Sequence, residues 1–170
     1  MIVRLQAPGD AADVRRINEL AFGQSLEADL VERLTAACRD ALSLVADDDG
    51  TVVGHILFTP LVIEPAGETN AGMGLAPMAV LPDRQRQGIG SALVREGLEI
   101  LRARGCPFVV VVGHPQYYPR FGFERASSHG LRCQWEGIPD DAFMVRILDA
   151  DATEHVSGVA RYRPEFDETA

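Results

Sequence analysis

The chain has 170 residues, of which 46% are hydrophobic and 24% charged, with a formal net charge of −9. These values are typical of one soluble globular domain, whose core needs neither a disulfide nor a metal. The acidic balance argues against nucleic acid as the main partner, because the backbone phosphates would be repelled.

The cellular compartment can be predicted from the cysteines and from the absence of a signal peptide and of a membrane-spanning stretch. Cys38, Cys106 and Cys133 are odd in number and far apart, which favours reduced thiols over a disulfide framework or a zinc site. The histidines are too scattered for a metal site. The segment from Met1 to Pro8 lacks the apolar run of a signal peptide, and no stretch has the length of a membrane span. We therefore expect a cytoplasmic protein without membrane contact.

The first part of the chain predicts a strand and two helices. Ile2 to Leu5 is a short apolar run, and Asp10 can cap a helix that ends at about Phe22. A second helix is expected from near Leu26. Apolar residues recur at helical spacing on both: Val14, Ile17, Leu20 and Ala21 on the first, and Leu26, Leu30, Leu34 and Ala37 on the second.

Strands dominate the next section. Ala41 to Ala46 and Thr51 to Thr59 predict two strands, joined at residues 47–50 by the hairpin signal Asp-Asp-Asp-Gly. Pro60 to Asn70 reads as a looser connection, and Leu75 to Leu81 as a further strand.

A strand–helix–strand unit follows. Ile89 to Arg104 predicts a helix whose buried stripe consists of Leu93, Val94, Gly97, Leu98 and Leu101, and Gly105 ends it. Phe108 to Val112 is a continuous β-branched run, as expected for a strand buried on both faces. The strands on either side of this helix should therefore be parallel.

The remainder is less regular. We expect a short helical turn after Gly113, a strand near Phe123 and a last strand from Phe143 to Leu148. The domain should thus span residues 1–150. Residues 151–170 are polar and predict a C-terminal tail with at most one docked segment, Val159 to Tyr162.

The glycine-rich stretch at residues 81–91 follows a strand and opens a helix. Backbone N–H groups at a helix N-terminus are unpaired and carry partial positive charge. Gly88 and Gly90 allow a ligand to approach closely, and Arg84 and Arg86 add positive charge, so the stretch suits a pyrophosphate. A plain strand-to-helix turn is the alternative. A Rossmann fingerprint would need glycine at Leu93, and a Walker loop would need a lysine, which the chain lacks.

The pattern Gln85-x-x-Gly88-x-Gly90 resembles the acyl-coenzyme A loop of the GNAT superfamily of N-acetyltransferases. The preceding strand contains Pro77, which often marks a bulge, and the resemblance implies a bulged strand that binds the pantetheine arm through backbone groups. The residues that it assigns to coenzyme binding are Met78, Ala79 and Val80 for the pantetheine, and Arg86, Gln87, Gly88, Ile89, Gly90 and Ser91 for the pyrophosphate.

A second motif lies at residues 113–123, where the run Tyr-Tyr-Pro-Arg-Phe-Gly-Phe is similar to that of a bacterial GNAT subgroup. Members of the superfamily commonly carry a tyrosine four residues before a Gly-Phe pair, here Tyr118 before Gly122. A phenol can donate a proton to the departing thiolate of the coenzyme. Both tyrosines could instead pack over the sheet; we favour packing for Tyr117 and catalysis for Tyr118.

The resemblance implies an α/β fold. A mixed, mostly antiparallel sheet of six or seven strands would carry helices on both faces and a splayed central parallel strand pair. The predicted enzyme transfers an acetyl group from acetyl-coenzyme A, its co-substrate, to a primary amine by direct attack in a ternary complex, without a metal. The amine could belong to a small molecule or a peptide. The sequence leaves the oligomeric state open, with a homodimer as one option.

Three further points stay open. A non-catalytic acyl-coenzyme A-binding sensor or interaction module is the alternative function, and the space beside Ala79 leaves a longer acyl group possible. The candidates for a general base are Glu27, His55, Glu64 and His114. A helix-terminal charge is the plainer interpretation of Glu27, a satisfied sheet histidine that of His55, and a loop cap is at least as good for His114. Cys106 is badly placed for an acetyl-cysteine route.

Overall fold

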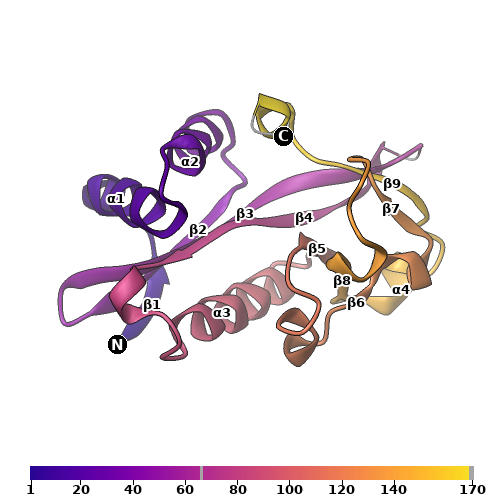
Figure 1. Cartoon of the computed structure of the whole chain (residues 1–170). Coiled ribbons are helices and arrows are strands. Elements are labelled where there is room, and N and C mark those ends of the chain that lie inside the picture. The colour runs from indigo at the N-terminus through magenta and orange to yellow at the C-terminus, as the bar shows by residue number, and fades with distance from the viewer. Residues whose placement is uncertain (66, 169–170) are drawn as a thin grey trace. The chain divides into compact units, whose positions relative to one another are not determined.

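The computed structural model describes residues 1–65 and 67–168 (Figure 1). The chain forms two compact units. The first comprises Met1–Thr59 and Ala76–Gly97 with the C-terminal segment from Pro164, and the second comprises Pro60–Leu75 and Leu98–Arg163. Two long strands and one helix pass from one unit into the other along the chain.

Antiparallel strand pairs form the centre of the first unit. β1 (Ile2–Leu5) pairs with β2 (Leu42–Asp48), and β2 pairs with the first part of β3 (Thr51–Glu64). The predicted hairpin between β2 and β3 is confirmed. The Gly50 N–H donates to Oδ1 of Asp47 over 2.7 Å, so the aspartate side chain closes the turn.

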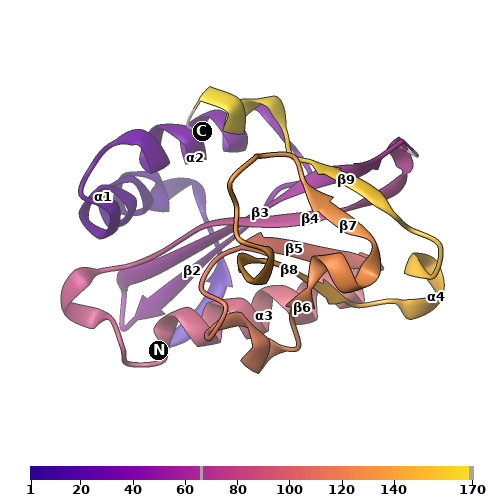
Figure 2. The ribbon, with the colours of Figure 1, turned by 45° about the vertical axis from the view of Figure 1, so that its right-hand side comes forward.

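Helices cover both faces of these strands, as expected. α1 (Ala11–Phe22) and α2 (Leu26–Ala37) lie side by side on one face, and the first part of α3 (Ile89–Ala103) lies on the other (Figures 1 and 2). Successive residues of β3 point to opposite faces. A Cβ at Gly54 would lie 2.9 Å from Cγ2 of Ile89 on α3, whereas the next residue, His55, contacts Asn18 on α1.

Two expectations for α1 and α2 are wrong in detail. Asp10 makes no side-chain cap bond to α1, because its carboxylate instead accepts from Arg4 at 2.7 Å and from the Ala7 N–H. Leu20 and Leu26 were expected to be buried but are 47% and 46% exposed. The other expectations hold in part, since Val14, Ile17, Leu30 and Leu34 are buried as predicted. The buried residues are Val14, Ile17 and Asn18 on α1, and Ala28, Leu30, Val31 and Leu34 on α2.

The second unit is organised around β5 (Phe108–Val112). This strand is parallel to β4 (Gly67–Val80) and antiparallel to β8 (Phe143–Ile147), which also pairs with β6 (Glu124–Arg125). The predicted parallel pair and the mixed, mostly antiparallel sheet are thus confirmed. Hydrogen bonding gives the strand order β1-β2-β3-β4-β5-β8-β6.

Two short strands lie off this path. β7 (Leu131–Cys133) is parallel to β9 (Gly158–Arg161), and β9 is antiparallel to β3, with Ile63 opposite Ala160. β9 matches the docked segment expected within the C-terminal stretch, whereas β7 was not predicted. The helical segments not yet named are α4 (Ala150–Thr153) and the 3-10 helices Pro8–Asp10, Pro82–Arg84, Tyr118–Phe121, Ala126–His129, Asp140–Ala142 and Pro164–Glu168.

The loose connection expected from Pro60 to Asn70 is wrong. β3 continues to Glu64, and β4 begins at Gly67. The ladder of β3 with β2 ends at Phe58, and its ladder with β9 begins at Val62. Pro60 lies between these two ladders, so its missing N–H interrupts neither of them.

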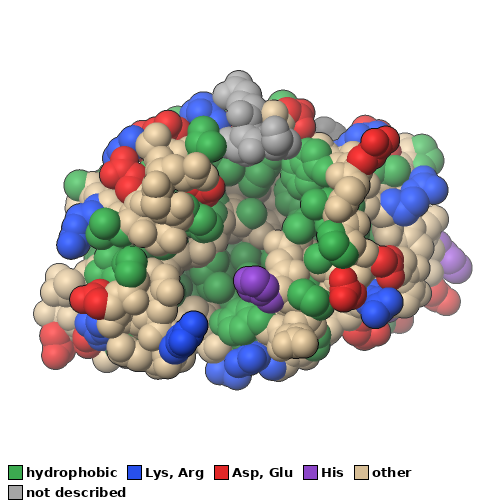
Figure 3. Space-filling view, viewed as in Figure 1, with side chains coloured by type: hydrophobic (Ala, Val, Ile, Leu, Met, Phe, Trp, Pro, Cys, Tyr) green, Lys and Arg blue, Asp and Glu red, His purple; other side chains and the backbone are tan. Residues whose placement is uncertain are grey.

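The face shown in Figure 3 carries side chains of both charges. Acidic and basic side chains are interspersed there among hydrophobic ones (Figure 3). Within the described ranges, no helix is long and apolar enough to cross a membrane.

Candidate functional site

The glycine-rich stretch folds into a compact loop between β4 and α3. The Leu81 N–H donates to the Val53 carbonyl over 3.0 Å, which attaches the start of the loop to β3. After the 3-10 turn, Arg86 and Gly88 adopt positive φ values of 62° and 85°. The Gln85 side chain donates back to the Val80 carbonyl over 3.1 Å. The loop is therefore held by its own hydrogen bonds and by the adjacent strand.

The N-terminus of α3 opens directly from this loop. Its first helical hydrogen bond runs from the Ala92 N–H to the Gly88 carbonyl over 3.0 Å, so the N–H groups of Ile89 and Gly90 precede the first helical donor. Space around Gly88 is open, since no atom would lie within 4 Å of a Cβ there. These amides, together with the positive end of the helix dipole, can receive an anionic group.

The two arginines of the loop differ in whether they form an ion pair. Nη2 of Arg84 lies 2.6 Å from Oδ2 of Asp48 on β2, and this ion pair lowers the pKa of the Asp48 carboxyl. Arg84 is therefore already neutralised within the protein, which the sequence did not predict. No ion pair of Arg86 occurs among residues 1–65 and 67–168, so these residues do not neutralise its charge.

The end of β4 carries the three residues expected to meet the pantetheine arm. Ala79 is buried, while Met78 and Val80 are half-buried. The ladder between β4 and β5 consists of the pairs Met73–Val109 and Gly74–Val110. Beyond Gly74, therefore, β4 makes no ladder bond to β5 within the described part of the chain.

Tyr118 lies in the second unit, at the start of the 3-10 helix Tyr118–Phe121. Its ring rests on the main chain of Gly113, where a Cβ would lie 2.4 Å from Cε2 of the ring. Edge-on contacts to Tyr117 and Phe123 hold it from other sides, at centroid distances of 5.1 and 5.6 Å. Sequence reasoning missed the role of Gly113, although a glycine directly after a buried strand was the available signal.

The phenol of Tyr118 is largely enclosed. Only 7% of the residue is exposed, and burial raises its pKa to about 12, because an enclosed phenolate loses its hydration. Its hydroxyl makes no hydrogen bond to any described residue. Tyr117, by contrast, is half-buried and packs beneath Arg120, whose guanidinium carbon lies 4.6 Å from its ring centroid.

His55 is excluded as a general base. It is fully buried, Nδ1 lies 3.2 Å from Nδ2 of Asn18, and Nε2 lies 2.9 Å from Oγ of Ser43. Burial lowers its pKa to about 3, so it stays neutral, and both ring nitrogens are already used. The interpretation as a satisfied sheet histidine is confirmed.

The other candidate bases have structural partners. Glu64 pairs with Arg161 at 3.1 Å, and Glu27 accepts from the Gln24 side chain at 2.9 Å. The side chain of His114 is exposed, and its carbonyl accepts from the Tyr117 N–H over 3.1 Å, which fits a loop cap.

The cysteines and the candidate metal ligands do not favour an acetyl-cysteine intermediate or a metal-dependent mechanism. Burial raises the pKa of Cys106, and its S–H donates to the Phe108 carbonyl over 3.3 Å. The thiol form is therefore favoured, and the thiolate is the nucleophile. Among the described residues, no group of three or more His, Cys, Asp or Glu side chains could hold a metal ion.

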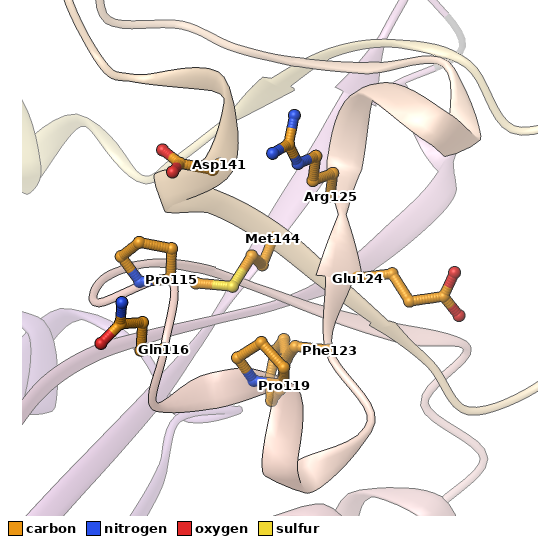
Figure 4. A pocket seen from close by; sticks show the side chains of 8 residues that line it. All are labelled: Pro115, Gln116, Pro119, Phe123, Glu124, Arg125, Asp141 and Met144. Atoms are coloured by element: carbon orange, nitrogen blue, oxygen red, sulfur yellow. The ribbon is translucent and has the colours of Figure 1, made fainter.

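A cavity of about 290 Å³ lies within the second unit. Figure 4 shows Arg125 and Asp141 on the same side of it, with Glu124 pointing away from the other side chains. Its lining combines apolar and charged residues: Pro115, Gln116, Pro119, Phe123, Glu124, Arg125, Asp141 and Met144.

Comparison with known proteins gives one consistent family. Residues 3–126 match the family described as acetyltransferase (GNAT) domain. The N-acetyltransferase YhbS of Escherichia coli K12 is 39% identical over 167 residues, which cover 98% of both chains.

Solved structures agree with the sequence comparison. The structure of Escherichia coli YhbS in complex with coenzyme A superposes with a TM-score of 0.89 at 37% identity, covering 98% of this chain and 91% of the other. A GNAT family acetyltransferase from Brucella melitensis in complex with acetyl-coenzyme A gives a TM-score of 0.80 at 36% identity, covering 98% and 97%.

Proposed function

Because the chain belongs to the acetyltransferase (GNAT) family, we propose that it transfers an acetyl group from acetyl-coenzyme A to a primary amine by direct attack in a ternary complex. The protein is an acyltransferase, and acetyl-coenzyme A is its co-substrate. One observation carries the proposal most directly: a relative that is 37% identical and superposes over 98% of this chain binds coenzyme A.

The loop before α3 is the proposed pyrophosphate site. The amides from Arg86 to Ser91 would cradle the diphosphate, supported by the left-handed backbone at Arg86 and Gly88 and by the open helix end before Ala92. The backbone of Met78, Ala79 and Val80 would hold the pantetheine arm, since β4 makes no ladder bond to β5 in this stretch.

Tyr118 is the proposed general acid. The amine nitrogen attacks the thioester carbon, and the tetrahedral intermediate collapses as the carbon–sulfur bond breaks. The thiolate then takes the proton of the Tyr118 hydroxyl, and the proton lost by the amine returns to the phenolate through water. A backbone N–H on the Met78 strand would stabilise the oxyanion. A pKa of about 12 keeps the phenol protonated at neutral pH.

A matched pair of tyrosine variants tests this role. Tyr118→Phe should lower turnover by about 10²-fold, measured as thiol release from acetyl-coenzyme A, while calorimetry gives an unchanged Kd for the coenzyme. Tyr117→Phe, which removes a hydroxyl one residue away, should keep the parent rate. Parent turnover in Tyr118→Phe would rule out the proton-donor role.

The acceptor can be narrowed by the same assay. A panel of amino acids, polyamines, aminoglycosides and peptides with free N-termini covers the main classes of primary amine. Saturable coenzyme binding with no thiol release for any member would favour the sensor function instead. We also propose that the protein works in the cytoplasm, where its three unpaired thiols would remain reduced.

A further inference from the structure

The side chain of Arg146 ends on the turn that carries Tyr118. Arg146 lies on β8, and its Nε donates to the Phe121 carbonyl over 3.0 Å. A second donor, Nη1, bonds the Ile147 carbonyl over 2.5 Å. Phe121 is the last residue of the 3-10 helix that begins with Tyr118. The guanidinium therefore ties the end of this helix to a strand of the sheet.

The contact between Arg146 and the turn is close as well as bonded. Gly122 follows the helix with φ of +86°, and a Cβ there would lie 2.7 Å from Nε and 3.0 Å from Cδ of Arg146. Glycine is thus required both for the left-handed backbone and for the space that the guanidinium occupies. The Gly122 N–H also donates to the Pro119 carbonyl over 3.0 Å, so the turn is held both by its own hydrogen bond and by Arg146.

The hydrogen bonds of Arg146 position the main chain and are not part of an ion pair with a described residue. The side chain is half-buried, yet no carboxylate pairs with it among the residues that the structure describes. Its hydrogen bonds to the described residues go only to the main-chain carbonyls of Phe121 and Ile147. Such charge-assisted bonds from a planar, rigid group fix direction well.

The Tyr118 ring is sensitive to a shift of this turn. The helix is only four residues long, so Phe121 is one turn away from Tyr118. The ring is wedged between the main chain of Gly113 and the ring of Phe123, which directly follows Gly122. A displacement of the Phe121 carbonyl would therefore move the Phe123 ring against the Tyr118 ring.

We propose that Arg146 is a positioning residue that holds the Tyr118 hydroxyl in its working orientation by anchoring the Phe121–Gly122 turn to β8. The inference rests on the proposed function, in which Tyr118 protonates the thiolate. Arg146 acts through Tyr118 and has no proton-transfer role of its own.

A double-mutant cycle tests this inference. The variants are Arg146→Met, Tyr118→Phe and their combination, and Arg146→Lys retains the charge with one donor group. Arg125→Met is the matched control, because Arg125 lies on the neighbouring strand β6 and pairs with Asp140 at 3.3 Å. Each variant is assayed for thiol release from acetyl-coenzyme A with the fastest amine of the panel, or with water as acceptor, and for coenzyme affinity by calorimetry.

Arg146→Met should lower turnover by about 10- to 100-fold, because small misplacements of a catalytic group have effects of this size. The Kd for acetyl-coenzyme A should not change, Arg146→Lys should recover part of the rate, and Arg125→Met should match the parent. The combined variant should be no slower than Tyr118→Phe alone. If the two losses multiply, or if Arg125→Met is equally slow, Arg146 does not act through Tyr118. A parent rate in Tyr118→Phe would instead overturn the acid role itself, and the inference with it.

Discussion

Protonation of His55 should destabilise the protein in mild acid. The Ser43 hydroxyl donates its single proton to Oε1 of Gln6 over 2.5 Å, so Ser43 accepts from Nε2 of His55. Nδ1 of His55 is then unprotonated and accepts from Nδ2 of Asn18, whose second proton goes to the Val14 carbonyl. A proton added at Nδ1 would face an N–H donor inside the buried core.

The size of the effect follows from the pKa difference. In the unfolded chain histidine has a pKa of about 6.5, whereas burial lowers that of His55 to about 3 in the folded protein. Between these values the unfolded state binds the additional proton, so stability falls as the pH decreases. From pH 7 to pH 5 the loss is about 2 kcal/mol. Aspartates add little in this window, because their ordinary pKa lies near 4.

Urea unfolding at pH 5, 6 and 7 measures this loss. In His55→Gln the amide can keep a donor and an acceptor in the network but does not titrate, so its stability should change by about 2 kcal/mol less than that of the parent chain over this range. His155→Gln, at an exposed position, should behave like the parent. Equal pH dependence of the parent and His55→Gln would show that the buried imidazole is not held neutral as argued.

Four further outcomes are expected. Gly113→Ala should lower turnover at least tenfold without weakening coenzyme binding, because its Cβ would lie 2.4 Å from the Tyr118 ring; an unchanged rate would contradict this packing. Gly88→Ala should cost about 1 kcal/mol in urea unfolding, since φ is +85°, and should raise the calorimetric Kd for acetyl-coenzyme A. Gly97→Ala should cost about 1–3 kcal/mol, because its Cβ would lie 2.3 Å from the Phe58 ring; full stability would mean that the ring can move aside. Burial raises the pKa of Tyr118 from 10 to about 12, so the folded state holds this proton longer, and Tyr118 should lower the stability between pH 10 and 12 by up to about 1.4 kcal/mol per pH unit. Burial also raises the pKa of Tyr162, so Tyr118→Phe should make this slope smaller without removing it.

Local sequence patterns predicted the elements that are determined by interactions between residues close in the chain. The hairpin at residues 47–50 formed because Asp47 closes its own turn, and α3 follows its apolar stripe up to the left-handed Gly105, with φ of +82°. The long course of β3 escaped prediction because Pro60 was interpreted as a strand breaker. Whether a proline breaks a strand depends on which strands pair beside it, and the local sequence does not reveal these partners.

Partners distant in the sequence account for the remaining differences. Asp10 accepts from Arg4 rather than capping α1, and Arg84 pairs with Asp48, 36 residues before it. Both residues were assigned roles from their immediate surroundings in the sequence. An ion pair formed by folding competes with such local roles and wins here, because a charged partner binds a carboxylate more strongly than a neutral N–H does.

The high pKa of Tyr118 bears directly on how it can assist the leaving group. In water a phenol is a weak acid toward a thiolate whose thiol has a pKa of about 8.5, and a pKa of about 12 widens the gap. Desolvation, however, disfavours the anion of both groups, and burial likewise raises the pKa of the thiols of Cys106 and Cys133 in the same unit. A thiolate released away from water is therefore a stronger base than in solution. A raised thiol pKa thus offsets the wider gap that burial of the phenol creates, while the high pKa of Tyr118 keeps the donor protonated when the step begins.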